Sequence, residues 1–369
     1  MTLIQVELQL IASVVAVACA LPGVFLVLRR MAMLSDAITH TVLLGIVLAF
    51  FLTGNLRSPL LLIGAALMGV ITVLLVEALF KTRLVKEDAA IGLVFPALFS
   101  IAVILVSRYS SGVHLDTDAV LMGELAFAPF HRFTPFGYDI GPVSLYLMIG
   151  ILLLNLAFIG LFYKELKLAT FDAGLAASLG FAPGLLHYGL MTVVSITAVG
   201  AFETVGSILV VALMVAPPIT AYLLTDSLAR MIGLSALVGI ASAISGYWLA
   251  FLLDASIAGS MATMAGVLFT VAFLFAPERG LVAISRRRAR QRWEFAQTML
   301  AIHLFHHEGL PEEEQENRLD HLHEHLRWQP DFAISVVEMA ERKGLIAKMN
   351  GNLVLSDRGR NLAQEAIVR

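Results

Sequence analysis

The chain has almost no cysteine and few charged residues, and both shortages narrow what it can be. Cys19 is the single cysteine among 369 residues, which excludes a disulfide framework and a cysteine-based zinc site. Charged residues make up 14% and hydrophobic residues 59% of the chain, against about 25% and about 45–50% in soluble domains. One soluble core cannot bury that much apolar surface. A soluble enzyme, a disordered chain and a fibrous protein are therefore excluded.

Two catalytic motifs are also missing from the sequence. No HExxH segment appears, so nothing supports an intramembrane zinc protease, and no GxxxxGK[ST] loop is present to hold the phosphates of ATP. We therefore predict that the chain is not an enzyme. Any transport driven by ATP would need a separate ATPase subunit.

The charged residues that are present gather at the C-terminal end. Residues 285–369 hold 13 of the 25 Lys and Arg residues and 13 of the 28 Asp and Glu residues, in less than a third of the length of the preceding part. This change of composition predicts two domains. Residues 1–284 form a membrane domain, and residues 285–369 form a soluble appendage.

Long apolar runs fill the first part, and about 20 apolar residues in a helix cross a bilayer. A ninth segment, residues 31–54, is apolar only from Val42 onward. Lys and Arg in short loops mark the cytoplasmic side, and nine spans with the N-terminus outside place all four basic clusters and the tail inside. We predict an all-α polytopic membrane protein with eight or nine spans. The eight clear runs are 8–28, 59–76, 89–107, 140–163, 184–202, 204–224, 232–253 and 257–276.

Asp36 and His40 stand out because ionisable residues inside a span are costly and usually functional. They are four residues apart, so a helix places them on one face, with Ser35 and Thr39 beside them as candidate supporting oxygens. One carboxylate and one imidazole are two metal ligands, and a twofold dimer would supply four. Such mixed ligands suit Mn(II), Fe(II) or Zn(II) rather than Cu(I). The alternative is that Ser35 or Asp36 only caps the helix.

A second candidate site is the cytoplasmic segment 164–181. Its apolar residues Phe171, Leu175 and Leu179 recur every four residues, which predicts one stripe on a short helix. Asp172 would lie in the first turn of that helix, and Gly180 would end it. We interpret the segment as a docking element for a soluble partner; the alternative is an interfacial helix that only contacts lipid.

The tail shows the element order of a winged helix. Helices are expected at about 293–308, 315–326 and 331–343, then a hairpin that turns at Asn350-Gly351, then a helix at about 357–367. This order resembles the winged helix of metal-dependent repressors. The basic stretch 286–292 suits anionic lipid headgroups, but the rest of the tail is acidic. We therefore expect no nucleic-acid partner.

Six of the ten histidines lie in this tail. His303 and His307 share one helical face, and His321 and His325 share another. These four residues are a candidate regulatory metal site that would sense cytoplasmic metal. The alternative is a scaffold that supports a dimer or an ATPase.

Five blocks of sequence follow one another in a recognisable order. They are FLVLRRMAMLSDAITHTVLLGIVLAF, KEDAAIGLVFPALFSIAVIL, HLDTDAVLMGEL, VGSILVVALMVAPPITAYLLTD and FAPERGLV. Together they resemble the permease family of ATP-binding-cassette (ABC) importers for Mn(II), Zn(II) and Fe(II), over roughly residues 5–283. Ser35 stands where the family has Gly, and Gly123-Glu124-Leu125 stands where it has Gly-Asn-Leu.

The resemblance implies the fold of type II ABC importers and a function. It implies a bacterial cytoplasmic-membrane permease that imports Mn(II), or Zn(II) or Fe(II), as a homodimer or paired permease with no permanently bound cofactor. ATP would bind two cytoplasmic ATPase subunits, and an extracytoplasmic receptor would deliver the metal. The family's Asp and His fall on Asp36 and His40, and its ATPase-coupling helix falls within 164–181, including Leu166. The competing hypothesis is a membrane-tethered metal sensor that acts through the histidine-rich tail.

Overall fold

The computed structural model describes residues 2–55, 58–109, 125–134, 139–311, 313–319, 321–322, 326–349 and 351–368. The chain folds as two compact units, Met1–Gly280 and Leu281–Arg369. The boundary lies four residues before the change of composition. Each unit has its own hydrophobic core.

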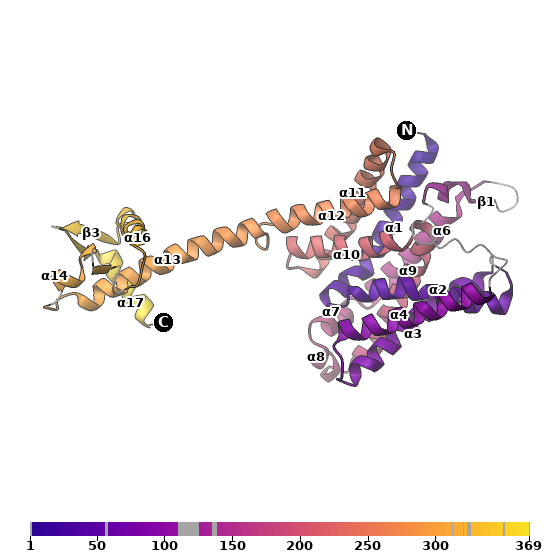
Figure 1. The fold of residues 1–369 in the computed structure, drawn as a ribbon, viewed down its shortest axis with the longest axis horizontal. Helices are drawn as coiled ribbons and strands as arrows, with labels where there is room; N and C mark the ends of the chain where they lie inside the picture. Colours follow the sequence, from indigo (N-terminus) through magenta and orange to yellow (C-terminus); the bar gives the residue numbers. More distant parts are fainter. Residues whose placement is uncertain are drawn as a thin grey trace. The chain divides into compact units, whose positions relative to one another are not determined.

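Nine helices in the described part of the chain are long and apolar enough to cross a membrane, with 18 to 26 residues each. The doubtful ninth segment forms a full helix, α2, because its polar start continues into the apolar run after Val42. The nine helices are α1 (Leu3–Leu28), α2 (Met33–Thr53), α3 (Pro59–Lys81), α4 (Glu87–Tyr109), α6 (Val143–Leu161), α9 (Pro183–Val205), α10 (Ser207–Leu224), α11 (Leu228–Leu253) and α12 (Ile257–Phe275) (Figure 1).

Helix α1 forms much of the core of the membrane unit and packs against α6, α9, α10 and α11. Most of its side chains from Leu8 to Leu26 are buried, although Leu10 is exposed. Asn155 of α6 donates hydrogen bonds to the carbonyl of Ala18 (2.8 Å) and to the hydroxyl of Thr197 on α9 (3.0 Å). A buried amide of this kind holds helices together where hydrophobic burial alone cannot.

Helix α2 is held against α3 by close backbone packing. A Cβ placed on Gly45 would lie 2.3 Å from the carbonyl oxygen of Gly64, so only glycine fits there. Small residues allow such approach between helices in lipid. Thr72 of α3 also donates a hydrogen bond to Thr41 of α2, at 2.7 Å. These contacts fix the helix that carries Asp36 and His40.

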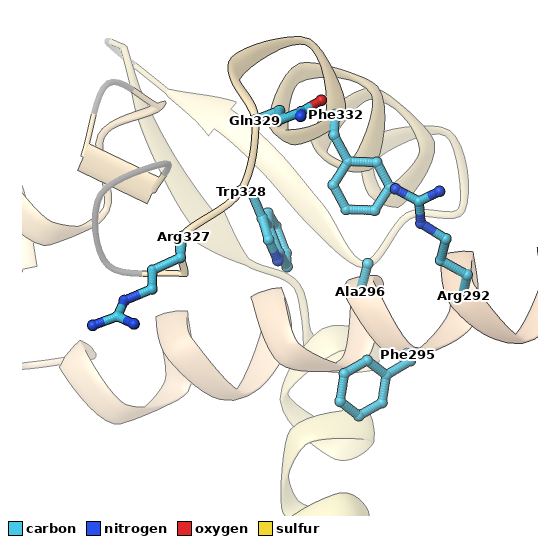
Figure 2. A pocket seen from close by; sticks show the side chains of 7 residues that line it. All are labelled: Arg292, Phe295, Ala296, Arg327, Trp328, Gln329 and Phe332. Atoms are coloured by element: carbon cyan, nitrogen blue, oxygen red, sulfur yellow. The ribbon is translucent and has the colours of Figure 1, made fainter.

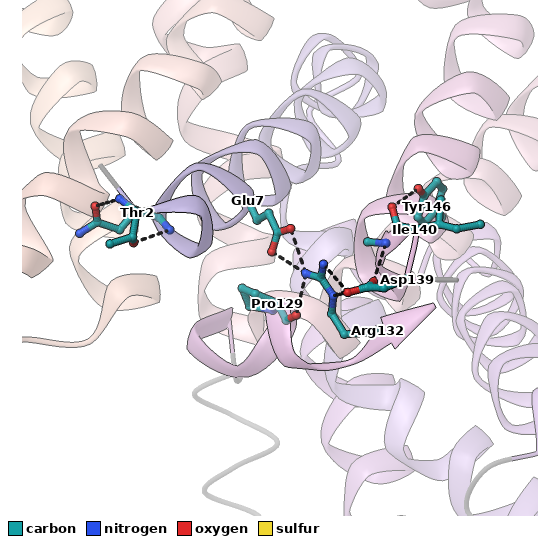
Figure 3. A network of polar contacts seen from close by, with 9 residues as sticks. Thr2, Glu7, Pro129, Arg132, Asp139, Ile140 and Tyr146 are labelled. Atoms are coloured by element: carbon teal, nitrogen blue, oxygen red, sulfur yellow. Dashed lines mark hydrogen bonds and ion pairs between the residues drawn. The ribbon is translucent and has the colours of Figure 1, made fainter. Parts of the chain in front are cut away.

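Among the described residues between α4 and α6, one arginine forms a link to the start of α1. These residues include the short helix η1 (Leu125–Phe130) and the two-residue strands β1 (Arg132–Phe133) and β2 (Gly141–Pro142), which pair antiparallel. Arg132 forms ion pairs with Glu7 at 2.7 Å and Asp139 at 2.8 Å (Figure 3). This bidentate use of one guanidinium links the loop to the first span.

The C-terminal unit combines helices with one hairpin. Helix α13 runs from Leu281 to His307 as one element, so the basic stretch and the first expected tail helix are continuous. The strands pair from Ile346↔Leu355 to Met349↔Asn352, and Gly351 in the turn has φ +87°. Asn350, and part of the expected helix 315–326, lie outside the described residues. The other elements are α14 (Glu313–Glu316), α16 (Pro330–Arg342), β3 (Ile346–Met349), β4 (Asn352–Leu355) and α17 (Asp357–Val368).

Candidate functional site

Asp36 and His40 lie together at the N-terminal end of α2. His40 Nε2 is 3.4 Å from Asp36 Oδ1, and the two side chains are 24% and 38% exposed. The four-residue spacing therefore brings them onto one face, as the sequence predicts. Asp36 is in the first turn of α2. In the predicted orientation, this turn lies in the cytoplasmic half of the span. Both groups remain accessible to a ligand from outside the chain.

The capping interpretation of this region is wrong. The N-cap of α2 is Ala32, and no side chain caps the helix. Ser35 and Thr39 are buried and donate their hydroxyl protons to backbone carbonyls of their own helix, Ser35 to Ala32 and Thr39 to Asp36. Neither hydroxyl donates to the carboxylate or the imidazole of the pair. These two hydroxyls therefore stabilise the backbone of α2 next to the pair.

Two aromatic rings that sequence reasoning missed pack against the imidazole. The ring centroids of Phe95 and Phe99 on α4 lie 5.2 Å and 5.8 Å from that of His40. Their own four-residue spacing indicated one helical face, but nothing in the sequence paired that face with α2. The rings cover part of the imidazole, whose Nε2 lies 3.4 Å from Asp36 Oδ1.

The coupling segment is two short helices rather than one. Helix α7 (Tyr163–Phe171) ends and α8 (Ala173–Ser178) begins at Asp172, whose backbone is extended at φ −150° and ψ 91°. The Asp172 side chain accepts a hydrogen bond from the Leu175 amide at 2.8 Å, so it is an N-cap rather than a first-turn residue. The predicted stripe is therefore broken at its first member, Phe171.

The predicted docking residues nevertheless form an exposed apolar group. Phe171, Leu175 and Leu179 are exposed, the first by 63%. Gly180 ends α8 with φ +86°, and its amide and that of Phe181 bond to the last carbonyls, which is a Schellman motif. Leu166 is fully buried in the core of the membrane unit. It anchors α7 and cannot contact a partner, which corrects its assignment to the docking surface.

Arg29 connects this segment to the spans. Its side chain hydrogen-bonds Thr170 of α7 at 3.2 Å and His187 of α9 at 3.3 Å. Burial lowers the pKa of the Arg29 guanidinium from its ordinary value, as it does for a cation removed from water. His187 is followed by Tyr188, which donates to Glu77 of α3 at 2.5 Å. Helix α7 is thus joined by a polar contact to Arg29 at the end of α1, which also contacts α9, and α9 in turn contacts α3.

In the C-terminal unit, two of the four predicted histidines lie together with an acidic residue that sequence reasoning missed. Ligand atoms of His303, His307 and Glu316 all lie within 4.8 Å of one another, the only such set of three found in the described residues. His321 is not a member of this set, and His325 lies outside the described residues. Glu316 was missed because α14 and α13 are joined by a turn whose path the sequence does not fix.

The same unit contains a surface hollow of about 410 Å³. Arg292 stacks over the ring of Phe332, with its guanidinium carbon 4.6 Å from the centroid. Trp328 and Phe295 also line the hollow (Figure 2). Such stacking holds the arginine against its own domain.

A model of the ABC 3 transport family matches residues 3–276. The chain belongs to the ABC 3 transport family. It is a multi-pass membrane subunit of an ABC transporter, and ATP hydrolysis resides on another subunit.

Relatives support the assignment along the whole chain. It is 49% identical over 358 residues, 97% of both chains, to "Zinc transport system membrane protein TroD" of Treponema pallidum. It is also 49% identical over 282 residues to "Manganese transport system membrane protein MntD" of Bacillus subtilis, covering 76% of this chain and 95% of that one. The C-terminal unit is thus within the first match, whereas the second relative is matched almost completely by a shorter part of this chain.

Solved structures agree with the fold. PsaBC from Streptococcus pneumoniae in complex with Fab has a TM-score of 0.64 and 26% identity, and covers 77% of this chain and 96% of that one. A putative metal-chelate type ABC transporter in an inward-facing conformation has a TM-score of 0.55 and 20% identity, and covers 72% and 84%. The all-α architecture is therefore that of ABC transporter permeases, as the sequence predicts.

Proposed function

We propose that the chain imports Mn(II), or alternatively Zn(II), across a bacterial cytoplasmic membrane, and that Asp36 and His40 bind the metal on its way. The observation that carries the proposal is the pairing of one carboxylate and one imidazole, 3.4 Å apart and partly exposed, at one end of a membrane helix. An ionisable pair in such a place is a functional site by default. The names of the relatives, which cite manganese or zinc transport, support the cargo.

The donor atoms of the pair determine which metals fit. One hard carboxylate oxygen for each imidazole nitrogen suits Mn(II), and the imidazole also suits Zn(II). We place Mn(II) first because, within the described part of the chain, no cysteine or second histidine joins the pair to favour zinc. Fe(II) fits the same donors, but none of the relatives considered above is named for iron transport.

Two ligands from one chain do not complete a metal site, so the proposal includes a second permease chain. The exposed face of the pair leaves room for a twofold-related copy, which would supply a second Asp36 and His40. Helix α4 lies beside the pair, and only 17% of its most apolar stretch is buried within a single chain. Lipid or a second permease covers the rest of such a helix.

The remaining partners follow from the division of labour in an ABC importer. Two ATPase subunits would dock on the exposed residues of α7 and α8, including Phe171, Leu175 and Leu179. An extracytoplasmic receptor would deliver the metal at the opposite side. The Arg29 contacts to Thr170 and His187 provide a physical path from the docking helices to the spans.

Metal uptake by reconstituted complex tests the proposal. Asp36→Ala and His40→Ala should each abolish Mn(II) and Zn(II) accumulation in vesicles, because each removes one ligand of a set that has no spare. Both variants should still insert and bind the ATPase subunits. Asp254→Asn is a matched control, because Asp254 ends α11 with φ +50°, which asparagine also adopts. Normal uptake by both site variants would show that the pair only supports the helix.

The competing function is a membrane-tethered metal sensor that acts through its tail. The three-ligand cluster at His303, His307 and Glu316 is the observation that favours it. Nine helices of the described residues that are long and apolar enough to cross a membrane, and a family model that matches residues 3–276, argue for transport. A variant lacking the tail separates the two hypotheses, because a sensor would lose its activity and a permease would keep it.

A further inference from the structure

We propose that His303, His307 and Glu316 form a second metal site, in the C-terminal unit, which binds a divalent transition metal and prefers Zn(II). The site is separate from Asp36 and His40 in sequence, unit and ligand set, so it does not depend on the proposed cargo site. His303 and His307 are one turn apart on α13, with ring centroids 4.8 Å apart. Glu316 reaches them from α14, and all three ligand atoms lie within 4.8 Å of one another.

One ring nitrogen of the three residues is already removed from water. The Nδ1 atom of His307 is buried and has no hydrogen-bond partner among the described residues. A buried polar atom without a partner is costly, and a metal ion would relieve that cost. His303 Nε2 lies 3.3 Å from the Glu316 carbonyl oxygen, so α14 is already positioned beside the histidine pair.

The ligand set determines which metal is preferred. Two imidazoles and one carboxylate are the protein ligands of several zinc sites that keep a fourth position for water. Bonds of about 2.0–2.1 Å in a tetrahedron place ligand atoms about 3.4 Å apart. Ligand atoms that lie within 4.8 Å of one another therefore need to approach by at most about 1.4 Å to bind one ion in this geometry. Zn(II) also binds such a site more tightly than Mn(II) in the general order of affinities.

All three residues are only partly buried, which suits an exchangeable ion more than a permanent structural one. A bound ion would join the C-terminal end of α13 to α14. The residue after Glu316, Asn317, accepts a hydrogen bond from the Leu353 amide on β4 at 2.9 Å. Next to His307, Glu308 pairs with Arg360 of α17 at 2.5 Å. The site therefore lies where α13 and α14 meet and next to contacts with β4 and α17, and binding should order these four elements.

Zinc binding to the full-length protein tests the inference. In the Asp36→Ala, His40→Ala double variant, which lacks the cargo site, we expect about one Zn(II) per chain. Adding His303→Ala or Glu316→Gln should weaken that binding at least about tenfold, because loss of outer-sphere partners alone weakens metal sites by 10–100-fold. His306→Ala is the matched control, since this exposed neighbour is not in the ligand set, and it should bind as before.

Hydrogen exchange gives a second readout and checks folding. Zn(II) should slow exchange of the Leu310, Asn317 and Leu353 amides, whose hydrogen bonds adjoin the site, and Glu316→Gln should remove this effect while keeping metal-free exchange unchanged. No zinc in the double variant, or equal affinity with and without Glu316→Gln, would overturn the second site. Transport could still depend on Asp36 and His40 in that case, so the two proposals fail separately.

Discussion

Asp36 and His40 show what one turn of helix can determine by itself. Their spacing predicts a shared face from the sequence, and the 3.4 Å separation follows from helix geometry. What surrounds the pair does not follow from spacing. Phe95 and Phe99 reach His40 from another helix, and the choice between α4 and any other span depends on packing over the whole unit.

Arg132 is a residue whose role only the structure makes visible. Its hydrogen bond holds the pKa of the Asp139 carboxyl below its usual range, against a smaller opposing effect of desolvation, and the two carboxylates raise the pKa of Arg132. The Asp139 carboxyl therefore binds a proton more readily when its contact with Arg132 is broken than when the contact is formed. We call the ion pairs of Arg132 with Glu7 and Asp139 the latch. The latch should be fully formed above about pH 4, the ordinary range of the Asp pKa, and should weaken as the pH falls through the lowered pKa of Asp139.

Replacing Arg132 should have the same effect at neutral pH as acid has on the wild-type chain, because both break the latch. In Arg132→Met, we expect faster hydrogen exchange at the amides of Gly141 and Val143, which bond to Asp139 and His131 in the closed loop. The wild-type chain should reach similar rates only below pH 4, after correction for intrinsic exchange. Arg108→Met, which removes a positive charge from the last turn of α4 and leaves the Arg132 ion pairs in place, is the control. Unchanged exchange in Arg132→Met at pH 7 would contradict the latch.

At the scale of elements, apolar patterns predict the membrane helices but not the point at which the cytoplasmic segment divides into two helices. Eight of the nine candidate spans in the described residues follow from long apolar runs, whereas α2 begins with a polar stretch. Helices α9 and α10 are separated only by Gly206 with φ +81°, where one glycine allows a sharp change of direction. The break between α7 and α8 was missed because a four-residue apolar repeat favours one continuous helix. Asp172 overrides it by bonding the Leu175 amide instead of continuing the turn.

Substitution of Asp172 tests whether the N-cap of α8 is needed to hold the docking residues in place. Asp172→Ala should weaken α8 by about 1 kcal/mol, the usual cost of losing an N-cap, and loosen the presentation of Leu175 and Leu179. We expect weaker co-purification of the ATPase subunits and a lower ratio of metal transported to ATP hydrolysed. Asp172→Asn should behave like the wild type, because asparagine caps equally well. Equal losses in both variants would indicate that the charge matters rather than the cap.

At the scale of the whole molecule, the change of composition predicts two units, and the structure divides the chain at Gly280 and Leu281. The family model covers residues 3–276, so the C-terminal unit is an addition to the transport core. Its helices and hairpin are described, but the assignment as a winged helix stays a prediction. The metal cluster there could be predicted only in part, because His303 and His307 share a helix whereas Glu316 approaches through a turn.

The last prediction concerns what this addition contributes to transport. A chain that ends after Arg292 keeps every helix of the membrane unit and loses the ligand cluster and the core around Leu300 and Val336. We expect it to insert, to bind its ATPase and to transport metal, because the core of the membrane unit includes no residue beyond Arg292. Its uptake should no longer respond to metal inside the vesicle.

The measurement is uptake into vesicles loaded with graded internal Zn(II) or Mn(II), comparing the full-length and shortened chains. Full-length Glu316→Gln should follow the shortened chain, since the loss of one ligand should suffice. Curves that superimpose for full-length and shortened chains at every internal concentration would exclude sensing. Failure of the shortened chain to bind its ATPase would instead assign the tail to assembly, which is the scaffold role that a unit with its own hydrophobic core could also perform.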